Sequence, residues 1–390
     1  MLDIYKQIEQ RIMEGSDLVK DVRISGVDGQ VMALVYPDFE RLKERKIINV
    51  RDEVKWYVVE AYNLNMINNI RVDSFKVVND MLAVSEEESS DKNLEQGKVY
   101  QQLKTYLESV TIIPVTSLSH LELDLELDSL EYVMLFVYVE KSFGLHLDEA
   151  TFSNLMLMKD LVKWIEEQHQ QCVEADVAWH DVLKHKSKEV LVRSPWVMMV
   201  WRAFCWPYFK LFHKIEAIGI ERLPAGNFII APTHHSALDG FAIIAALPAP
   251  VLRETFFLAY EGEFGKPHLR PLAKHSQMLL IDINKDLIAS LQRTALPLME
   301  SKNLVIFPEN ARSRDGKLLP FKKFFAVLST ELKLPVVPVI LKGTFEAMPT
   351  GAMLPKRVPI TVEFLNPVYP EDMDDVTLNM KVQEYVKAHR

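Results

Sequence analysis

NFIIAPTHHSALDGFAIIAAL, residues 227–247, joins two apolar runs through a short polar turn. The first run, NFIIAP, has the length and composition of a buried strand, and ALDGFAIIAAL is long enough to form a helix. A buried strand followed at once by a helix is typical of an α/β domain. The turn holds two adjacent histidines, His234 and His235, with Asp239 just beyond them. The stretch therefore predicts an α/β domain with polar residues where a strand ends and a helix begins.

The spacing alone does not select which histidine pairs with Asp239. Ser236 suits a helix N-cap, with Asp239 three residues later, close to a capping box. His235 and Asp239 are four residues apart and would share a face of a helix that begins early. His234 and Asp239 are five apart, about 140° around an ideal helix, so they pair only if His234 folds back from the turn. A capping turn and a general base held by a carboxylate both remain open at this point.

The composition excludes several classes of protein. The chain of 390 residues is 48% hydrophobic and 25% charged, which is ordinary for globular proteins of two or three domains. The start lacks a secretory signal, and no run of about 18 uncharged apolar residues predicts a membrane-spanning helix. Cys172 and Cys205 cannot form a disulfide framework and lie in no metal-type spacing. We therefore expect a reducing, cytoplasmic setting and no metal site.

The net charge of −9 is unevenly distributed. Residues 1–185 have a balance of −15, and residues 186–390 have a balance of +6. The acidic first half argues against nucleic acid as a partner, whereas the basic second half suits a membrane surface or phosphate-bearing ligands. In PWVMMVWRAFCWPYFKLF (195–212), tryptophans flanked by cations are typical of a membrane interface. Burial of that segment against its own domain is an equal alternative.

Two polar or charge-changing segments divide the chain. We predict linkers at 85–97 and 174–194, and hence a multidomain protein. A small α+β domain is expected at 1–84, a helical domain at 98–173, and an α/β domain at 195–390.

In residues 1–84, Asp28 and Gly29 predict a hairpin turn. The order of elements and the phrase GVDGQVMALVYPDFE resemble the C-terminal lid domain of acyl-adenylate-forming ligases. The adenylation core is absent from this chain, and SFKVVNDMLAV holds no counterpart of the lid's catalytic lysine. We therefore expect no adenylation here, but a packing or docking domain, or a lid that serves a separate acyl-adenylating ligase.

Ser129 stands at the expected start of a long helix in residues 98–173. The unpaired N–H groups there suit a phosphate on the serine oxygen, although Asp128 or Ser129 could simply be an N-cap. With DLELDSL, FGLHLDEATF and MKDLVKWIEE, the segment resembles the acyl carrier protein family, a four-helix bundle, with Glu126 where many carriers have glycine. The resemblance implies a 4′-phosphopantetheine cofactor on Ser129, which a phosphopantetheinyl transferase attaches and which holds acyl thioesters.

The last domain resembles the glycerolipid acyltransferases. MLLIDIN (278–284), FPENARSRDGKLLPFKK (307–323) and LPVVPVILKG (334–343) match the family's second, third and fourth blocks in order. The first block is the HX4D signature, which falls on Thr233, His234, Ser236 and Asp239 and makes His235 the variable position. The resemblance implies that His234 is the general base and that Asp239 orients it. It further implies that the acceptor or its phosphate is bound by Glu309, Arg312 and Ser313.

Two blocks depart from the family pattern. The third block usually reads Glu-Gly-Thr-Arg, but here it is Glu309-Asn310-Ala311-Arg312. The second usually ends Ile-Asp-Arg, but Ile283 replaces its phosphate-gripping arginine, and Lys285 and Arg293 are out of register. Lysophospholipids with larger headgroups, or another lipid alcohol or amine, therefore compete with glycerol-phosphate-type acceptors.

The combined resemblance implies a peripheral enzyme on the inner face of the cell membrane. It would transfer a fatty acyl group from a thioester donor to the hydroxyl of a lysophospholipid or glycerol-phosphate-type acceptor. The donor would be the Ser129 arm, a free acyl carrier protein or acyl-CoA. A different interpretation makes the chain an acyl carrier and docking scaffold for a separate ligase, with a weakly active or inactive transferase half.

Overall fold

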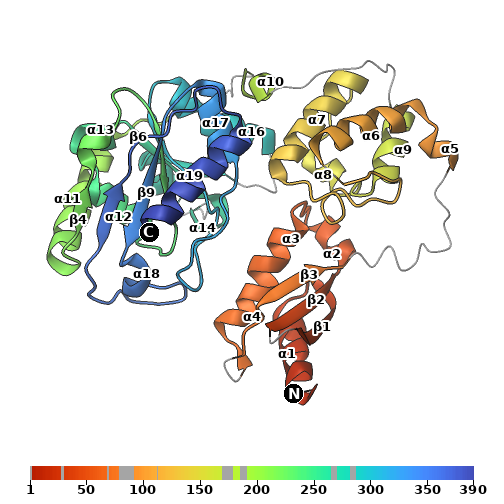
Figure 1. The fold of residues 1–390 in the computed structure, drawn as a ribbon, viewed down its shortest axis with the longest axis horizontal. Helices are drawn as coiled ribbons and strands as arrows, with labels where there is room; N and C mark the ends of the chain where they lie inside the picture. The colour runs from red at the N-terminus through yellow and green to blue at the C-terminus, as the bar shows by residue number, and fades with distance from the viewer. Residues whose placement is uncertain are drawn as a thin grey trace. The chain divides into compact units, whose positions relative to one another are not determined.

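The computed structural model describes residues 2–27, 30–67, 70–78, 92–111, 113–168, 179–184, 191–264, 270–281 and 287–390. The chain forms two compact units (Figure 1), Met1–Ala178 with Ile283–Leu287, and Trp179–Asp282 with Ile288–Arg390. Some predicted features fall outside the described residues: the hairpin turn Asp28–Gly29, Cys172, the end of the second block (282–284) with the neighbouring Lys285, and parts of both predicted linkers.

Residues 2–78 of the first unit form a small α+β domain, which we call the front domain. β1 (Val19–Val27) and β2 (Gln30–Pro37) pair antiparallel on either side of the predicted turn, and β3 (Ser74–Val77) pairs parallel with β2. The helices are α1 (Leu2–Gly15), α2 (Phe39–Glu44), α3 (Val50–Glu53), the π-helical η1 (Val54–Val59) and α4 (Glu60–Leu64). The last three form one continuous helical run, and apolar residues from it pack with those of α1 and the sheet into one core.

Residues 92–168 of the same unit are helical, and we call them the helical region. Its helices are α5 (Lys92–Glu95), α6 (Lys98–Val110), α7 (Ser129–Phe143), α8 (Glu149–Phe152) and α9 (Met158–Gln168). α7 begins at Ser129 because Asp128 caps it in a capping box with Glu131. It ends at Gly144, whose φ of 71° is the left-handed conformation that glycine adopts without strain.

Parts of both predicted linkers are packed. Leu94 of α5 is buried, and the Glu95 carboxylate accepts a hydrogen bond of 2.8 Å from Ser117 Oγ. In the second unit, α10 (Trp179–Lys184) contributes Leu183 to the core, and Leu191 joins the same cluster. The leucines are surrounded in sequence by polar residues, so the composition of these segments does not indicate that the leucines are buried.

The second unit is built on a seven-stranded sheet in the order β4-β10-β9-β5-β8-β6-β7. The strands are β4 (Glu216–Ile218), β5 (Ile229–Pro232), β6 (Thr255–Tyr260), β7 (Met278–Ile281), β8 (Asn303–Val305), β9 (Val336–Lys342) and β10 (Thr361–Phe364). Every pair of neighbouring strands described here is parallel except β9 and β10.

Helices cover both faces of this sheet (Figure 1), which gives the α/β layering that the opening stretch predicts. Successive residues of β5 alternate between two cores: Ile230 packs with residues of α11 and α12, and Ile229 packs with residues of α17 and α19. The helices are α11 (Pro195–Phe212), η4 (Ile220–Arg222), α12 (Asp239–Ala246), α13 (Ala249–Arg253), α14 (Glu261–Phe264), α15 (Arg270–His275), α16 (Leu287–Met299), α17 (Phe324–Leu332), α18 (Thr344–Ala347) and α19 (Asp375–His389).

The parallel strands β5, β8 and β9 end at one edge of the sheet. Ligands of open α/β sheets bind at the carboxyl ends of such strands. The turn after β5 holds His234, the loop after β8 is the third block, and the loop after β9 begins at Gly343. The topology thus brings three predicted motifs to one edge.

Candidate active site

The turn after β5 differs from the predicted capping arrangement. α12 begins at Asp239, with Leu238 in the N-cap position, so the prediction that Ser236 caps the helix was wrong. Instead, Ser236 Oγ accepts the N–H of Leu238 at 3.1 Å and donates to the Met348 carbonyl at 2.7 Å. The later helix start leaves both histidines on the turn.

His234 folds back over the start of α12 and meets Asp239. Its Nδ1 lies 2.9 Å from Asp239 Oδ2, and the Asp239 side chain is fully buried. The same oxygen accepts the backbone N–H groups of His235 at 2.6 Å and Ser236 at 2.8 Å. Three donors on one oxygen fix the carboxylate, so the arrangement assigns the His234 proton to Nδ1 and the lone pair to Nε2.

The His234 ring is held from a second side and remains accessible. Its centroid is 4.0 Å from that of Phe307, and the rings are nearly parallel, with an interplanar angle of 27°. The side chain is 21% exposed, and Nε2 has no hydrogen-bond partner among the described residues. A reacting hydroxyl could therefore approach Nε2 without displacing a protein group.

His235 lies in a different environment. It is 2% exposed, and neither ring nitrogen has a hydrogen-bond partner among the residues that the structure describes. Burial lowers the pKa of His235 to about 4, so the ring is neutral near pH 7. It contributes its backbone N–H to Asp239, whereas His234 contributes its ring.

Glu309 connects the third block to the backbone of His234. One carboxylate oxygen accepts the backbone N–H of His234 at 2.7 Å, and the other accepts that of Leu319 at 2.7 Å. Burial raises the pKa of Glu309 to about 7, against the opposing effect of these two bonds. Because both oxygens are engaged by the backbone, the geometry favours a positioning role over the expected contact with an acceptor.

Ser313 also connects the third block to His234, through the His234 carbonyl. Its N–H donates to the His234 carbonyl at 2.9 Å, while its hydroxyl donates to Asp315 at 3.1 Å. The side chain is buried, so it is not placed to meet an acceptor directly. Arg312, the preceding residue, is partly exposed and belongs to the same loop.

Asn310 explains one departure from the family pattern. Its φ is 56°, a left-handed conformation that favours glycine and that asparagine tolerates better than most residues. The usual glycine of the third block is therefore replaced by a residue that can keep the backbone geometry.

Sequence reasoning missed two contributors to the site. Met348, the C-cap residue of α18, accepts the Ser236 hydroxyl with its carbonyl. Arg390 donates from its guanidinium to the carbonyl of Gly316 in the third block. Its positive charge lowers the pKa of Glu309, against the larger effect of burial, and adds to the lowered pKa of His235. Neither residue lies in a recognisable motif.

The second block, in which Ile283 replaces the family's phosphate-gripping arginine, is only partly described. Arg293 donates from Nη1 to the carbonyl of Leu280 at 2.8 Å, so this group braces β7. Among the described residues, no three His, Cys, Asp or Glu side chains are grouped as metal ligands.

α11 presents an apolar face to solvent. Trp196, Phe204 and Leu211 are 71%, 70% and 75% exposed, while Met198 and Phe209 on other faces are buried in the core. Burial against the domain is therefore confirmed for part of the helix, and the membrane interface stays a prediction. Within the described residues, no helix combines the length and hydropathy needed to cross a bilayer.

In the first unit, Ser129 is the first residue of α7 and is partly buried. Asp128 supplies the cap, so the Ser129 hydroxyl is not needed for capping and donates to Asn49 Oδ1 at 2.7 Å. Glu126, where many carriers have glycine, has a φ of 58° and is ion-paired with Arg51 at 3.5 Å.

Comparison with known proteins finds similarity within the second unit. Residues 214–342 match the model of the Acyltransferase family. A 1-acyl-sn-glycerol-3-phosphate acyltransferase of Limnanthes douglasii is 36% identical over 162 residues, 41% of this chain and 55% of the relative. One of Limnanthes alba is 35% identical over 176 residues, 44% of this chain and 59% of the relative. The chain thus spans little more than half the length of these curated relatives.

A solved structure is also similar, that of the 1-acyl-sn-glycerophosphate (LPA) acyltransferase PlsC from Thermotoga maritima. It is 26% identical, covers 50% of this chain and 78% of its own, and has a TM-score of 0.44.

Proposed function

We propose that this chain transfers an acyl group from a thioester to the hydroxyl of a lysolipid of the glycerol-phosphate type. The observation that carries the proposal is the 2.9 Å contact between His234 Nδ1 and Asp239 Oδ2, with Nε2 left open on a ring that solvent reaches. The match of residues 214–342 to the Acyltransferase family and the names of the two plant relatives support the same chemistry.

The reaction needs one base and one leaving group. His234 Nε2 takes the proton of the acceptor hydroxyl as its oxygen attacks the thioester carbonyl. Asp239 holds the ring and stabilises the imidazolium that forms. When the C–S bond breaks, the departing sulfur takes the proton from Nε2, which restores the neutral ring. An ester and a free thiol result, so atoms and charge balance.

The transfer is direct, without an acyl-enzyme intermediate. The two hydroxyls nearest the base in sequence are already engaged: that of Thr233 accepts the Leu341 N–H, and that of Ser236 donates to the Met348 carbonyl. Ser313 is buried, and its hydroxyl points at Asp315. Donor and acceptor must therefore be bound together, and the open side of His234 is where their reacting atoms meet.

Positive charge on the third block suits a phosphate on the acceptor. Arg312 belongs to the loop that Glu309 and Ser313 fix against His234, and Arg390 is attached to the same loop through Gly316. An arginine fork matches phosphate oxygens in geometry as well as in charge. With Ile283 in place of the second-block arginine, an acceptor with a larger headgroup than a bare phosphate is accommodated.

The thioester donor is a 4′-phosphopantetheine arm on Ser129, with a free acyl carrier protein or acyl-CoA as alternatives. The Ser129 hydroxyl does not cap α7, which supports the arm on Ser129 as the donor. A donor held on the same chain has a local concentration on the order of millimolar if the linker spans the distance. The acyl-adenylating ligase that charges the arm is a separate protein.

The enzyme works at a membrane surface, on its cytoplasmic side. The exposed aromatic residues of α11 and the basic balance of residues 186–390 support this proposal. A lysolipid acceptor would enter from the same interface.

The test is product formation by the full chain, purified after co-expression with a phosphopantetheinyl transferase. Acyl carrier protein, acyl-CoA and the charged chain itself are each offered as donors to vesicles that contain lysophosphatidate, other lysophospholipids or glycerol 3-phosphate. Ester formation with any donor supports the transferase. No ester with any combination would favour the carrier and docking scaffold instead.

A further inference from the structure

The front domain and the helical region meet at Ser129. The Ser129 hydroxyl donates to Asn49 Oδ1 at 2.7 Å, across 80 positions of sequence. Asn49 is the N-cap residue of α3 but makes no capping hydrogen bond with its side chain. The side chain that would ordinarily cap this helix is thus turned toward the serine of the helical region.

Glu122 of the helical region takes over the capping. Its carboxylate accepts the backbone N–H groups of Val50 and Arg51, both at 2.7 Å, and it is only 6% exposed. Burial raises the pKa of Glu122 to about 7, against the opposing effect of these two bonds. The front domain therefore contacts the helical region through two polar groups: Asn49 accepts the Ser129 hydroxyl, and the start of α3 is capped by the buried Glu122.

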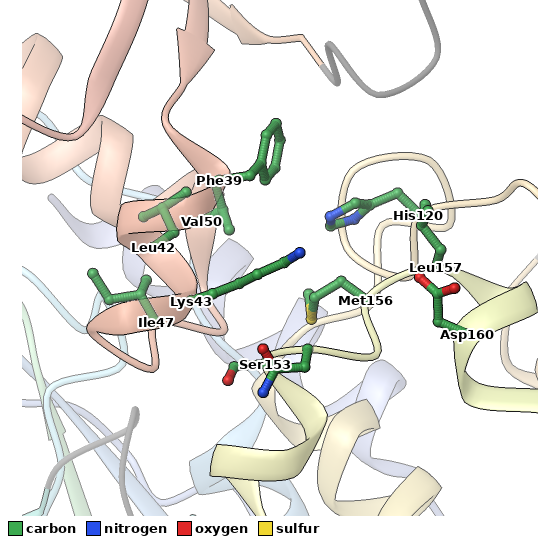
Figure 2. A pocket seen from close by; sticks show the side chains of 11 residues that line it. Phe39, Leu42, Lys43, Ile47, Val50, His120, Ser153, Met156, Leu157 and Asp160 are labelled. Carbon is green, nitrogen blue, oxygen red and sulfur yellow. The ribbon is translucent and has the colours of Figure 1, made fainter. Parts of the chain in front are cut away.

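Further contacts surround this polar centre. Arg51 pairs with Glu126 at 3.5 Å, and the rings of Phe39 and His120 lie 5.9 Å apart. A groove beside the contact has Phe39, Leu42, Lys43, Ile47 and Val50 on one side and His120, Met156, Leu157 and Asp160 on the other. Figure 2 shows Lys43 extending from the front domain toward the side of His120 and Met156.

We propose that the front domain is a clasp that responds to the chemical state of Ser129. It holds the helical region while the serine carries a free hydroxyl, and it releases when a phosphate-linked group replaces the hydroxyl proton. The phosphate-linked group is the 4′-phosphopantetheine arm on Ser129, and in this respect alone the clasp rests on the proposed function.

The release follows from the donors and acceptors at the contact. In the modification, Ser129 Oγ bonds to phosphorus of coenzyme A, adenosine 3′,5′-bisphosphate leaves, and the hydroxyl proton goes to a base of the transferring enzyme. Ser129 then has no proton to donate to Asn49. The phosphate brings a negative charge beside the buried Glu122. The N–H groups of Val50 and Arg51 at the start of α3, which would attract that charge, are already bound to the Glu122 carboxylate.

A charged substitution tests the clasp without any transferase. Ser129→Glu places a negative charge at the first residue of α7, a position where helices tolerate acidic residues, so folding is expected to survive. Ser129→Ala removes the hydrogen bond alone, and Asn49→Ala removes it from the other side. Ser109→Glu, at an exposed serine of α6, is the matched control for added charge.

The readout is amide hydrogen exchange of Val50 and Arg51 in the full chain, with circular dichroism to verify helix content. These two N–H groups are protected by Glu122, so release should speed their exchange by about tenfold in Ser129→Glu. We expect a smaller increase in Ser129→Ala and Asn49→Ala and none in Ser109→Glu. Unchanged exchange in Ser129→Glu would overturn the clasp.

Loading separates this proposal from the donor proposal. If a phosphopantetheinyl transferase adds an arm of about 340 Da to Ser129, exchange at Val50 and Arg51 should rise as in Ser129→Glu. An arm with unchanged exchange contradicts the clasp. If no arm is added, the donor proposal fails, while the exchange of Ser129→Glu still decides whether the clasp exists.

Discussion

His234 Nδ1 lies 2.9 Å from Asp239 Oδ2, although five sequence positions separate the two residues. The contact forms because α12 begins at Asp239, which leaves His234 on the turn and free to fold back. Two backbone N–H groups of the turn join it on the same oxygen. The carboxylate thus orients the turn and the imidazole together.

Asp239→Asn should cost both activity and stability. An amide cannot stabilise an imidazolium as a carboxylate does, so we expect acyl transfer to slow by about 10²–10⁴-fold. It also weakens the bonds to two buried N–H groups, at a cost of about 2 kcal/mol in the free energy of unfolding. Steady-state kinetics and thermal unfolding measure these effects. Asp375→Asn in α19 is the control, and equal rates in the two variants would argue against the assigned role.

Glu309→Gln should change how stability depends on pH. The pKa of Glu309 is about 7 in the folded protein, above its ordinary value of 4.5. Its contribution to stability is therefore complete below pH 4.5 and is lost as the pH rises through about 7. The free energy of unfolding of wild type relative to Glu309→Gln, measured by thermal unfolding, should fall between pH 5 and pH 8 by an amount on the order of 3 kcal/mol. A difference that does not vary with pH would contradict the burial of an ionisable group there.

Position 310 should tolerate substitution by glycine but not by a β-branched residue. With φ at 56°, Asn310→Gly keeps the backbone, whereas Asn310→Val forces a branched side chain into the left-handed region. We expect Asn310→Val to lower stability by about 1–2 kcal/mol and Asn310→Gly to change it little. Thermal unfolding compares the two, and a valine variant as stable as wild type would mean that the loop has another conformation.

The exposed face of α11 should govern membrane binding. Replacing Trp196 and Phe204 by alanine removes two of the most exposed apolar side chains, so binding to anionic vesicles should weaken by about tenfold or more. Vesicle co-sedimentation measures this. Tyr57→Ala, at a 52% exposed aromatic of the front domain, should leave binding unchanged. Equal loss in both variants would show that general surface hydrophobicity is responsible.

Local chemistry could be predicted from the sequence where a motif carried it. The strand, turn and helix around His234 and the α/β layers were readable from apolar runs. The helix start was misplaced, because Ser236 and Asp239 also satisfy a capping pattern and no local rule decides which oxygen takes which N–H. The positive φ of Glu126 and Asn310 could have been suspected, since both stand where the resembled families have glycine.

Contacts between distant segments could not be predicted. The bond from Ser129 to Asn49 and the cap that Glu122 supplies to α3 depend on tertiary packing across more than 70 positions. The same holds for Glu309, whose carboxylate suggests a ligand in sequence but is occupied by two backbone groups. Polar residues such as these reveal their partners only when the fold is known.

The central claim is that His234 is the base, and it is tested by ester formation with His234→Ala and His235→Ala measured side by side. The full chain is given a thioester donor and a lysolipid in vesicles, and thermal unfolding verifies that both variants fold. We predict that His234→Ala lowers the rate by about 10²–10⁴-fold, whereas His235→Ala retains it within about threefold. A His234→Ala enzyme as active as wild type, or an equal loss in both variants, would contradict the account.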